Sequence, residues 1–339
     1  MNNKYNIVTC ASFGASGSGV ITDYLNEYSC IKNLGDYELR FLQDYDGVST
    51  LEDALIHSPH RLNSDIAIQN YQRYVDRQCG TFLNRRYEKF FGGQWKNISD
   101  AFLKKLIDAK WLGYWEQYQI MAPSKFHAFL KYQLYPRVLR LLAGNRKYIA
   151  HYLPQKSMYF SAPSEDYFLN CVREYIRDLC NVVDPKHEYR YLFMDQLMPP
   201  ANISKYERYF DSVKTIVVDR DPRDYYIENV LRWGEGWVPK SVEDFALLFR
   251  KHRAQAKAFT DSSNVLRLRF EDAVFKYDGF ENTVRDFLEL DKSEHVNPRR
   301  YFNPAKSVQN TCLWTKRKVD FAIIDQIEKL LPEFLYDFG

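Results

Sequence analysis

A short apolar run followed by a glycine-rich turn and a helical pattern constrains the fold of this chain more than any other feature. Tyr5 to Phe13 are rich in strand formers, Gly14, Gly17 and Gly19 follow, and the apolar residues of "VITDYL" then recur at helical spacing. A turn that opens a helix presents unpaired backbone N–H groups, which can hold an anion. The pattern therefore predicts a phosphate-binding turn, with a tight structural turn as the alternative.

Three further runs of strand formers, at 189–194, 213–219 and 264–270, alternate with long helical patterns. This alternation favours an α/β fold with a mainly parallel sheet. Between 55 and 160 the helical patterns are dense in Tyr, Trp and Phe, with no convincing central strand. We therefore predict a single three-layer α/β domain over 1–339 with a central, mainly parallel sheet, and with 55–160 as a large helical, aromatic-rich insertion or subdomain.

Composition narrows the class of protein. With 45% hydrophobic residues and a formal charge of +3, the chain is typical of a soluble globular protein without a global preference for nucleic acid. No stretch approaches the ~20 apolar residues that span a bilayer, and the first apolar run is too short for a signal peptide, so we expect a cytoplasmic protein. The cysteines and histidines lack ligand spacing, and we expect no metal.

The glycine turn differs from a nucleoside triphosphate loop at its end. Gly14 and Gly19 have the spacing of a Walker loop, yet Val20 and Ile21 stand where that loop needs Lys and Ser or Thr. Those two side chains reach the terminal phosphates and Mg²⁺. Hydrolysis of ATP or GTP is therefore disfavoured.

Two later stretches also carry groups that can bind phosphate. The apolar strand in "TIVVDRDPRD" ends in Arg220 and Arg223, where ligands of open α/β sheets bind. Alternatively, these arginines pair with the neighbouring aspartates Asp219, Asp221 and Asp224. The loop "YFNPAKSVQNTCLWTKRK", residues 301–318, contains several Lys and Arg residues just before the last helical pattern. Alternatively, this run of charges is an ordinary solvated surface.

In this order the three stretches, together with "LRFED" at 268–272, resemble the nucleotide-binding elements of P-loop sulfotransferases that use 3′-phosphoadenosine 5′-phosphosulfate (PAPS). The likeness is best to bacterial and carbohydrate-type members. It implies that the glycine turn holds the 5′-phosphosulfate, that Arg220 binds the 3′-phosphate and that the loop at 301–318 covers the nucleotide. The nucleotide site so implied consists of Ser16, Gly17, Ser18, Gly19, Val20, Arg220, Trp314 and Arg317.

Two departures from the family pattern affect the implied chemistry. Ala15 stands where the family places a lysine or arginine that steadies the transferring group. The resemblance then requires a cation from elsewhere, for which we predict Lys306 or Lys316. Glu228 stands where the family places a serine on the 3′-phosphate, and its charge would repel that group unless it points away.

A catalytic base is expected in "LGDYELRFLQDYDG", residues 34–47, on a short strand after the first helix. We predict Glu38, because carbohydrate sulfotransferases resemble this chain in having a catalytic glutamate at the second strand. Arg40 would position the Glu38 carboxylate. Alternatively, Glu38 is only paired with Arg40 at the surface and has no catalytic role. Asp36 and Asp44 are the other candidates for the base. The histidines considered as bases and set aside, because none follows a predicted strand, are His127, His151, His187 and His252.

The sequence therefore predicts an enzyme that transfers a sulfuryl group from PAPS to a hydroxyl or amine of a carbohydrate-type acceptor, by in-line displacement and without a metal. The aromatic region at 55–160 is the expected place for a small-molecule or glycan acceptor, although the same residues are typical of packed helices. The alternatives are a P-loop kinase-like phosphotransferase and a non-catalytic protein that binds nucleotide or glycan. Oligomeric state is not predicted.

Overall fold

A five-stranded parallel sheet forms the centre of the protein. The computed structural model describes residues 4–35, 37–81 and 83–338. The strand order is β2-β5-β1-β6-β7, and the predicted α/β fold with a central parallel sheet is confirmed. The five strands are β1 (Ile7–Ser12), β2 (Ile31–Asn33), β5 (Tyr191–Phe193), β6 (Val213–Asp219) and β7 (Val265–Arg269).

The central strands are apolar on both faces because helices cover both sides of the sheet. On β1, Ile7 and Ala11 face one hydrophobic core, whereas Val8 and Cys10 face the other. All four side chains are buried, with exposed fractions of 2% or less. This double burial explains why the strand reads as a continuous apolar run in the sequence.

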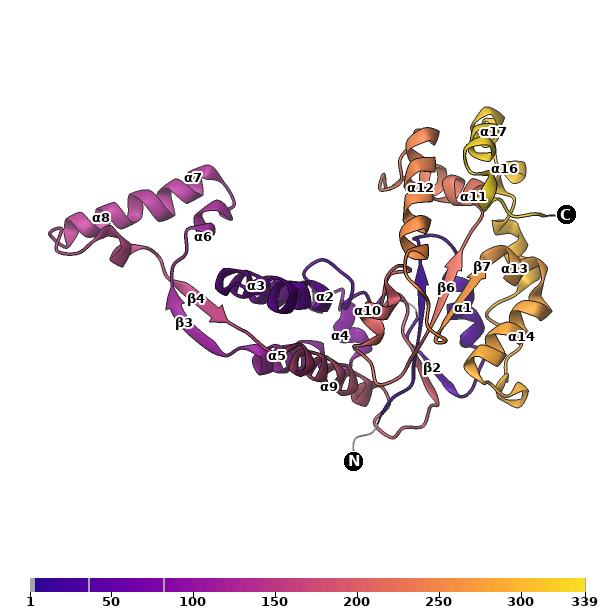
Figure 1. Cartoon of the computed structure of the whole chain (residues 1–339), viewed down its shortest axis with the longest axis horizontal. Coiled ribbons are helices and arrows are strands. Elements are labelled where there is room, and N and C mark those ends of the chain that lie inside the picture. The colour runs from indigo at the N-terminus through magenta and orange to yellow at the C-terminus, as the bar shows by residue number, and fades with distance from the viewer. Residues whose placement is uncertain (1–3, 36, 82, 339) are drawn as a thin grey trace.

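Two groups of helices cover the two faces, and a third group lies at the carboxyl edge of the strands (Figure 1). The first face carries α2 (Val48–Glu52), α3 (Arg61–Cys79), α4 (Arg86–Phe90), α5 (Trp95–Leu106), α9 (Glu165–Val183) and α10 (Ile203–Glu207). The second carries α1 (Gly19–Leu25), α13 (Phe270–Phe275) and α14 (Tyr277–Leu288). The edge carries α11 (Pro222–Tyr226), α12 (Val242–Lys257), α15 (Pro304–Ser307), α16 (Leu313–Lys316) and α17 (Phe321–Leu330).

Residues 109–160, which we call the arm, project away from this body (Figure 1). An antiparallel pair, β3 (Ala109–Gly113) and β4 (Lys156–Phe160), forms the stalk of the arm. Its distal part holds α6 (Gln117–Ile120), α7 (Lys125–Ala128) and α8 (Tyr135–Leu142), with a π-helical segment (Phe129–Leu134) between the last two. In the described ranges, no helix has both the length and the apolar character to cross a bilayer.

The structure differs from the sequence-based description of the strands in two places. The 55–160 segment contains strands β3 and β4, whose pairing joins residues about 50 positions apart. Four of the five residues of β3 are exposed, so the strand lacks the apolar alternation by which sequence reasoning finds strands. The second strand of the main sheet ends at Asn33, so the 34–47 stretch that carries Glu38 is not a strand.

The aromatic residues of α3, α4 and α5 mostly pack the core. Trp95 is fully buried, and its indole N–H donates to the Val75 carbonyl at 3.2 Å. The rings of Tyr87 and Phe41 meet it edge-on, with centroids 4.9 and 5.5 Å away. Near the body, the aromatic density of the sequence therefore reflects packing, whereas the arm keeps many large side chains exposed.

Replacing Trp95 tests this packing. Trp95→Ala removes a fully buried ring and leaves a cavity, so we expect the free energy of unfolding to fall by about 3 to 5 kcal/mol. Urea unfolding measures this change. Trp111→Ala, at a ring in the arm that is 43% exposed, is the matched control and should cost much less. Equal losses in the two variants would contradict the assignment of Trp95 to the core.

Candidate functional site

The glycine turn between β1 and α1 leaves a row of backbone donors free. Gly14, Ala15 and Gly17 have positive φ angles of 83°, 48° and 106°. None of the five N–H groups from Ala15 to Gly19 donates a hydrogen bond to another described residue. Consecutive free N–H groups in such a turn form a concave anion site. The turn therefore retains the donors that a phosphate or sulfate group needs.

Ser16 and Val20 build the turn with their side chains. The Ser16 hydroxyl is fully buried, donates to the Val218 carbonyl at 2.7 Å and accepts from the Phe13 N–H at 3.1 Å. The Val20 side chain is buried in the core beneath α1, and its N–H donates to the Gly17 carbonyl at 3.0 Å. These side chains hold the turn in shape and offer no free polar group to a ligand.

Gly17 cannot be replaced without disturbing the turn. A Cβ atom at this position would lie 2.6 Å from the Phe270 ring, and the φ of 106° strains any other residue. At Gly19, in contrast, no atom lies within 4 Å of the place a Cβ would take. The turn is therefore closed on the side of α13 and open at the start of α1.

Arg220, which directly follows β6, reaches back to the glycine turn. Its side chain is 4% exposed and donates to the carbonyl oxygens of Ala15, at 3.3 Å, and of Asn310. The guanidinium also lies 4.9 Å from the centroid of the Phe270 ring. It makes no ion pair with a described carboxylate, and its buried Nε has no hydrogen-bond partner there. A buried donor of this kind can be satisfied by an anion.

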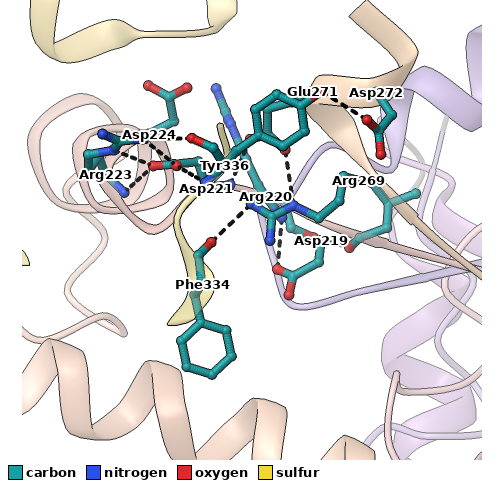
Figure 2. A network of polar contacts seen from close by, with 12 residues as sticks. Asp219, Arg220, Asp221, Arg223, Asp224, Arg269, Glu271, Asp272, Phe334 and Tyr336 are labelled. Carbon is teal, nitrogen blue, oxygen red and sulfur yellow. Dashed lines mark hydrogen bonds and ion pairs between the residues drawn. The ribbon is translucent and has the colours of Figure 1, made fainter. Parts of the chain in front are cut away.

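Arg223, three residues later, holds the C-terminal segment instead (Figure 2). It donates to both oxygens of Asp221, at 2.8 and 2.9 Å, and to Glu328 at 2.7 Å. The Trp314 ring lies 4.1 Å from its guanidinium carbon, and Asp221 also accepts from the Tyr336 N–H at 2.8 Å. Arg223 thus pairs with a neighbouring aspartate, which was the alternative to phosphate binding. Trp314 packs against this ion pair.

The Asp224 carboxylate anchors the loop at 301–318. It accepts the N–H groups of Cys312, at 2.9 Å, and Leu313, at 2.6 Å. Burial raises the pKa of Asp224 to about 7, and the charge of Arg220 opposes this rise. The contact brings the loop against α11, so that its Asn310 carbonyl meets Arg220.

The predicted cations of this loop have different surroundings. The ammonium of Lys316 donates to the carbonyls of Val308 and Thr311, at 2.5 and 2.6 Å, and so closes its own loop. Lys306 and Arg317 are exposed, and their side chains make no hydrogen bond or ion pair with a described residue. The ammonium of Lys306 therefore has no partner in the described chain.

Glu228 is largely buried and paired within its own helical segment, Ile227–Trp233. Its Oε1 accepts from Arg232 at 2.5 Å and from the Trp233 indole at 3.2 Å. Its Oε2 is buried without a partner in the described chain. The ion pair with Arg232 offsets the negative charge that would repel a phosphate.

A cavity of about 550 Å³ opens beside the glycine turn at the carboxyl edge of the sheet. Glu38 lines this cavity together with Ser12 at the end of β1, and it lies on an irregular segment rather than on the predicted strand. We call it the edge cavity; its lining includes Ser12, Phe13, Gly14, Glu38, Arg40, Gln43, Gln196, Glu235, Trp237, His252 and Gln255.

The Glu38 carboxylate is exposed, with Arg40 Nη1 at 3.6 Å. The Nε of Arg40 donates to Asp44 at 2.9 Å, and Asp44 also accepts from the Tyr74 hydroxyl at 3.1 Å. Asp44 is thus held by two partners, whereas Asp36 lies outside the described residues. Among the predicted carboxylates, Glu38 has the most direct access to the edge cavity.

His252 lines the edge cavity although sequence reasoning set it aside. It lies on α12, which crosses the carboxyl edge of the sheet, so a helix rather than a strand brings it to the site. Burial lowers its pKa, with a smaller contribution from the neighbouring Arg253. The imidazole is consequently neutral at neutral pH and able to accept a proton.

Asp195, just beyond β5, is a second group that sequence reasoning missed. It is 6% exposed, and its Oδ1 has no partner in the described chain. Burial raises its pKa to about 8, with a further contribution from the charge of Glu38. The sequence pattern could have identified it, because Asp195 and Gln196 directly follow the apolar run at 189–194, just as Asp219 and Arg220 stand at the end of the run at 213–219.

The raised pKa of Asp195 predicts a pH-dependent stability. Between about pH 4 and 8 the folded state keeps this proton while the unfolded state loses it, so the group destabilises the fold as pH rises. Asp195→Asn removes this effect. We expect its gain in unfolding free energy over the wild type to grow by up to ~1.4 kcal/mol per pH unit and to level off above pH 8.

Chemical denaturation of both proteins between pH 5 and 9 measures this gain. Asp278→Asn, at an exposed carboxylate on α14, is the control and should show no such trend. A difference between Asp195→Asn and the wild type that stays constant over this range would contradict a neutral Asp195 in the folded protein.

A search with models of known protein families found no match to this chain. A search of curated proteins found none either. Among solved structures, the sulfotransferase domain of the Synechococcus PCC 7002 olefin synthase is 14% identical, with 100% of this chain and 98% of that chain covered and a TM-score of 0.42.

Two further solved structures are similar to the chain. The sulfotransferase domain of the curacin biosynthetic pathway is 10% identical, with 99% of this chain and 100% of that chain covered and a TM-score of 0.44. A retinol dehydratase in complex with androsterone and the inactive cofactor PAP is 16% identical, with 99% and 82% covered and a TM-score of 0.34. These likenesses are too distant to support a conclusion about activity.

Proposed function

We propose that this protein transfers a sulfuryl group from PAPS to a hydroxyl group of an acceptor bound in the edge cavity. The observation that carries the proposal is the convergence of two unsatisfied sets of donors: the free N–H groups from Ala15 to Gly19, and the buried Nε of Arg220. Arg220 reaches the turn through its contact with the Ala15 carbonyl, and Gly14, the first glycine of the turn, lines the cavity that also contains Glu38. The order of the sequence stretches that resemble PAPS-dependent sulfotransferases supports the same assignment.

The donors present fit the two ends of this nucleotide. The N–H groups of the glycine turn suit the oxygens of a phosphosulfate, because each can donate without a competing partner in the described chain. Arg220 suits the 3′-phosphate, which would replace its present contacts to the carbonyls of Ala15 and Asn310. The ion pair of Glu228 with Arg232 lowers the repulsion that Glu228 would otherwise exert.

The proposed reaction is an in-line displacement at sulfur. PAPS supplies the activated sulfuryl group, and adenosine 3′,5′-bisphosphate leaves as the bond between sulfur and the bridging oxygen breaks. The acceptor oxygen forms the new bond to sulfur, and Glu38 takes the acceptor proton. Its exposed carboxylate lines the same cavity as Gly14, which follows β1, and this shared cavity supports the assignment of Glu38 as the base.

Lys306 is our candidate for the cation that Ala15 does not provide. Its ammonium is exposed and makes no contact that ligand binding would have to break, whereas Lys316 holds the carbonyls of Val308 and Thr311. A cation placed near the developing charge stabilises the transition state. Lys316 would then contribute by keeping the loop at 301–318 in place.

A carbohydrate-type acceptor agrees with the lining of the edge cavity. Trp237 and Phe13 offer aromatic surface on which a sugar ring can stack, and the amides of Gln43, Gln196 and Gln255 can bond to hydroxyl groups. The volume of about 550 Å³ is sufficient for a mono- or disaccharide-sized group.

Arg220→Ala tests the nucleotide site. We expect adenosine 3′,5′-bisphosphate to bind about tenfold or more weakly to the variant, because a charge-assisted contact to the 3′-phosphate is lost. Binding of 5′-AMP, which lacks that phosphate, should change much less. Calorimetric titration measures both ligands, with Arg250→Ala, at an exposed arginine on α12, as the control. Tighter binding of ATP with Mg²⁺ than of the bisphosphate would instead favour a phosphotransferase.

Glu38→Gln tests the base. We expect turnover of PAPS with a panel of mono- and disaccharides to fall by about 10²-fold or more, because the amide cannot accept the proton. The affinity for adenosine 3′,5′-bisphosphate should stay unchanged. His252→Gln is the matched comparison in the same cavity. A large loss in His252→Gln together with full turnover in Glu38→Gln would assign the base to His252.

A further inference from the structure

The arm combines two properties that the rest of the chain does not share. Of the 27 large hydrophobic side chains that are exposed in the described chain, 14 lie at 109–160. The same residues hold eight Lys or Arg and a single acid, Glu116, although the whole chain has 47 basic and 44 acidic residues. Positive charge and exposed apolar surface are thus concentrated at one end of the molecule (Figure 1).

The exposed apolar residues follow one side of a continuous helical stretch. Helix α7, the π-helical segment and α8 together run over 125–142, about 27 Å if helical throughout. One side packs on the arm itself through Tyr132 and Pro136, which are buried. The side chains exposed along this stretch are Phe126, Phe129, Leu130, Leu134, Tyr135, Val138, Leu141 and Leu142.

The positive charges of the arm are not neutralised within the protein. No Lys or Arg of residues 109–160 takes part in an ion pair with a described residue. Arg137 lies on α8 among the exposed apolar residues, and Arg146 and Lys147 follow that helix in an exposed loop. A partner that covers this surface must therefore accept apolar side chains and supply negative charge.

We propose that the arm docks on the surface of an anionic lipid bilayer, with the apolar side of 125–142 in the interface and the cations at the headgroups. A helix with an apolar face and flanking Lys or Arg binds such an interface. Pairing of two arms would bury the apolar residues equally well, but it would bring two sets of unpaired positive charges together. Nucleic acid would satisfy the charges and leave the apolar residues in water.

The docking surface lies on the arm, at a distance from the sheet edge that carries the candidate site (Figure 1). The proposal is therefore independent of the proposed function. If both hold, the protein would act on acceptors presented at a membrane surface.

Flotation of the full chain with lipid vesicles tests the proposal. We expect the wild type to float with vesicles of phosphatidylcholine and phosphatidylglycerol at low salt, and to float at least tenfold less with phosphatidylcholine alone. Because charges near the surface are screened, raising the salt concentration should weaken binding. Failure to float with the anionic vesicles at low salt overturns the proposal.

Two double variants separate the apolar and the charged contributions. Leu141→Glu with Leu142→Glu, and Arg146→Gln with Lys147→Gln, should each reduce flotation about tenfold or more. All four side chains are exposed, so the fold should be retained, which circular dichroism and the Tm will verify. The matched control, Leu83→Glu with Leu247→Glu, makes the same change at exposed leucines outside the arm and should float like the wild type.

Other results would assign the surface differently. Flotation that is lost in the charge variant but unchanged in the leucine variant would indicate a purely electrostatic contact and would overturn docking of the apolar side. Concentration-dependent self-association that the leucine variant abolishes, without flotation of the wild type, would identify a second copy of the chain as the partner.

Discussion

The burial of charge directly after β6 is the constraint on which the rest of the candidate site depends. Asp221 and Asp224 are both fully buried, and a buried carboxylate is costly unless hydrogen bonds and opposite charge compensate it. Arg223 compensates Asp221, and further hydrogen bonds come from the C-terminal part of the chain, through the backbone N–H groups of Cys312, Leu313 and Tyr336. Because Asp224 binds the backbone of the loop at 301–318, this loop lies beside Arg220, which also contacts the glycine turn. The loop and the turn are more than 200 residues apart in sequence.

The same short segment shows how tertiary contacts give similar residues different roles. Arg220 and Arg223 are equally cationic and lie three residues apart, so either could bind a phosphate. Arg223 is saturated by Asp221, Glu328 and the Trp314 ring. Arg220 instead donates to two carbonyls and keeps a buried Nε without a partner in the described chain. Replacing neutral carbonyl acceptors by a phosphate is favourable, whereas breaking a buried ion pair is not, so Arg220 is better suited than Arg223 to bind an anion.

The edge cavity brings together groups from four separate parts of the chain. Gly14 ends β1, Glu38 follows β2, Gln196 follows β5, and His252 comes from α12. The first three obey the rule that ligands of parallel sheets bind beyond the carboxyl ends of strands. His252 does not, because a helix that crosses this edge can add a side chain at any point along its inner face. Two possible bases thus share one cavity, and their separation in sequence gives no indication of it.

The α/β fold and the chain order of the glycine turn, the strand-end arginines and the loop at 301–318 could be predicted from the sequence alone. These features depend on local patterns: apolar runs, the glycines of the turn, and charged residues at strand ends. The prediction of Arg220 rested on its place directly after an apolar strand and on the resemblance to a known family, and that of Glu38 on the resemblance. Which polar groups stay free could not be predicted, because several of the contacts that decide it, such as that of Arg223 with Glu328, join residues that are distant in sequence. The pairing of β3 with β4 could not be predicted either, because an exposed strand lacks the apolar alternation by which strands are recognised. The exposed apolar side of the arm was also hidden, because an aromatic-rich amphipathic helix has the same sequence pattern whether its apolar side is packed or open to solvent.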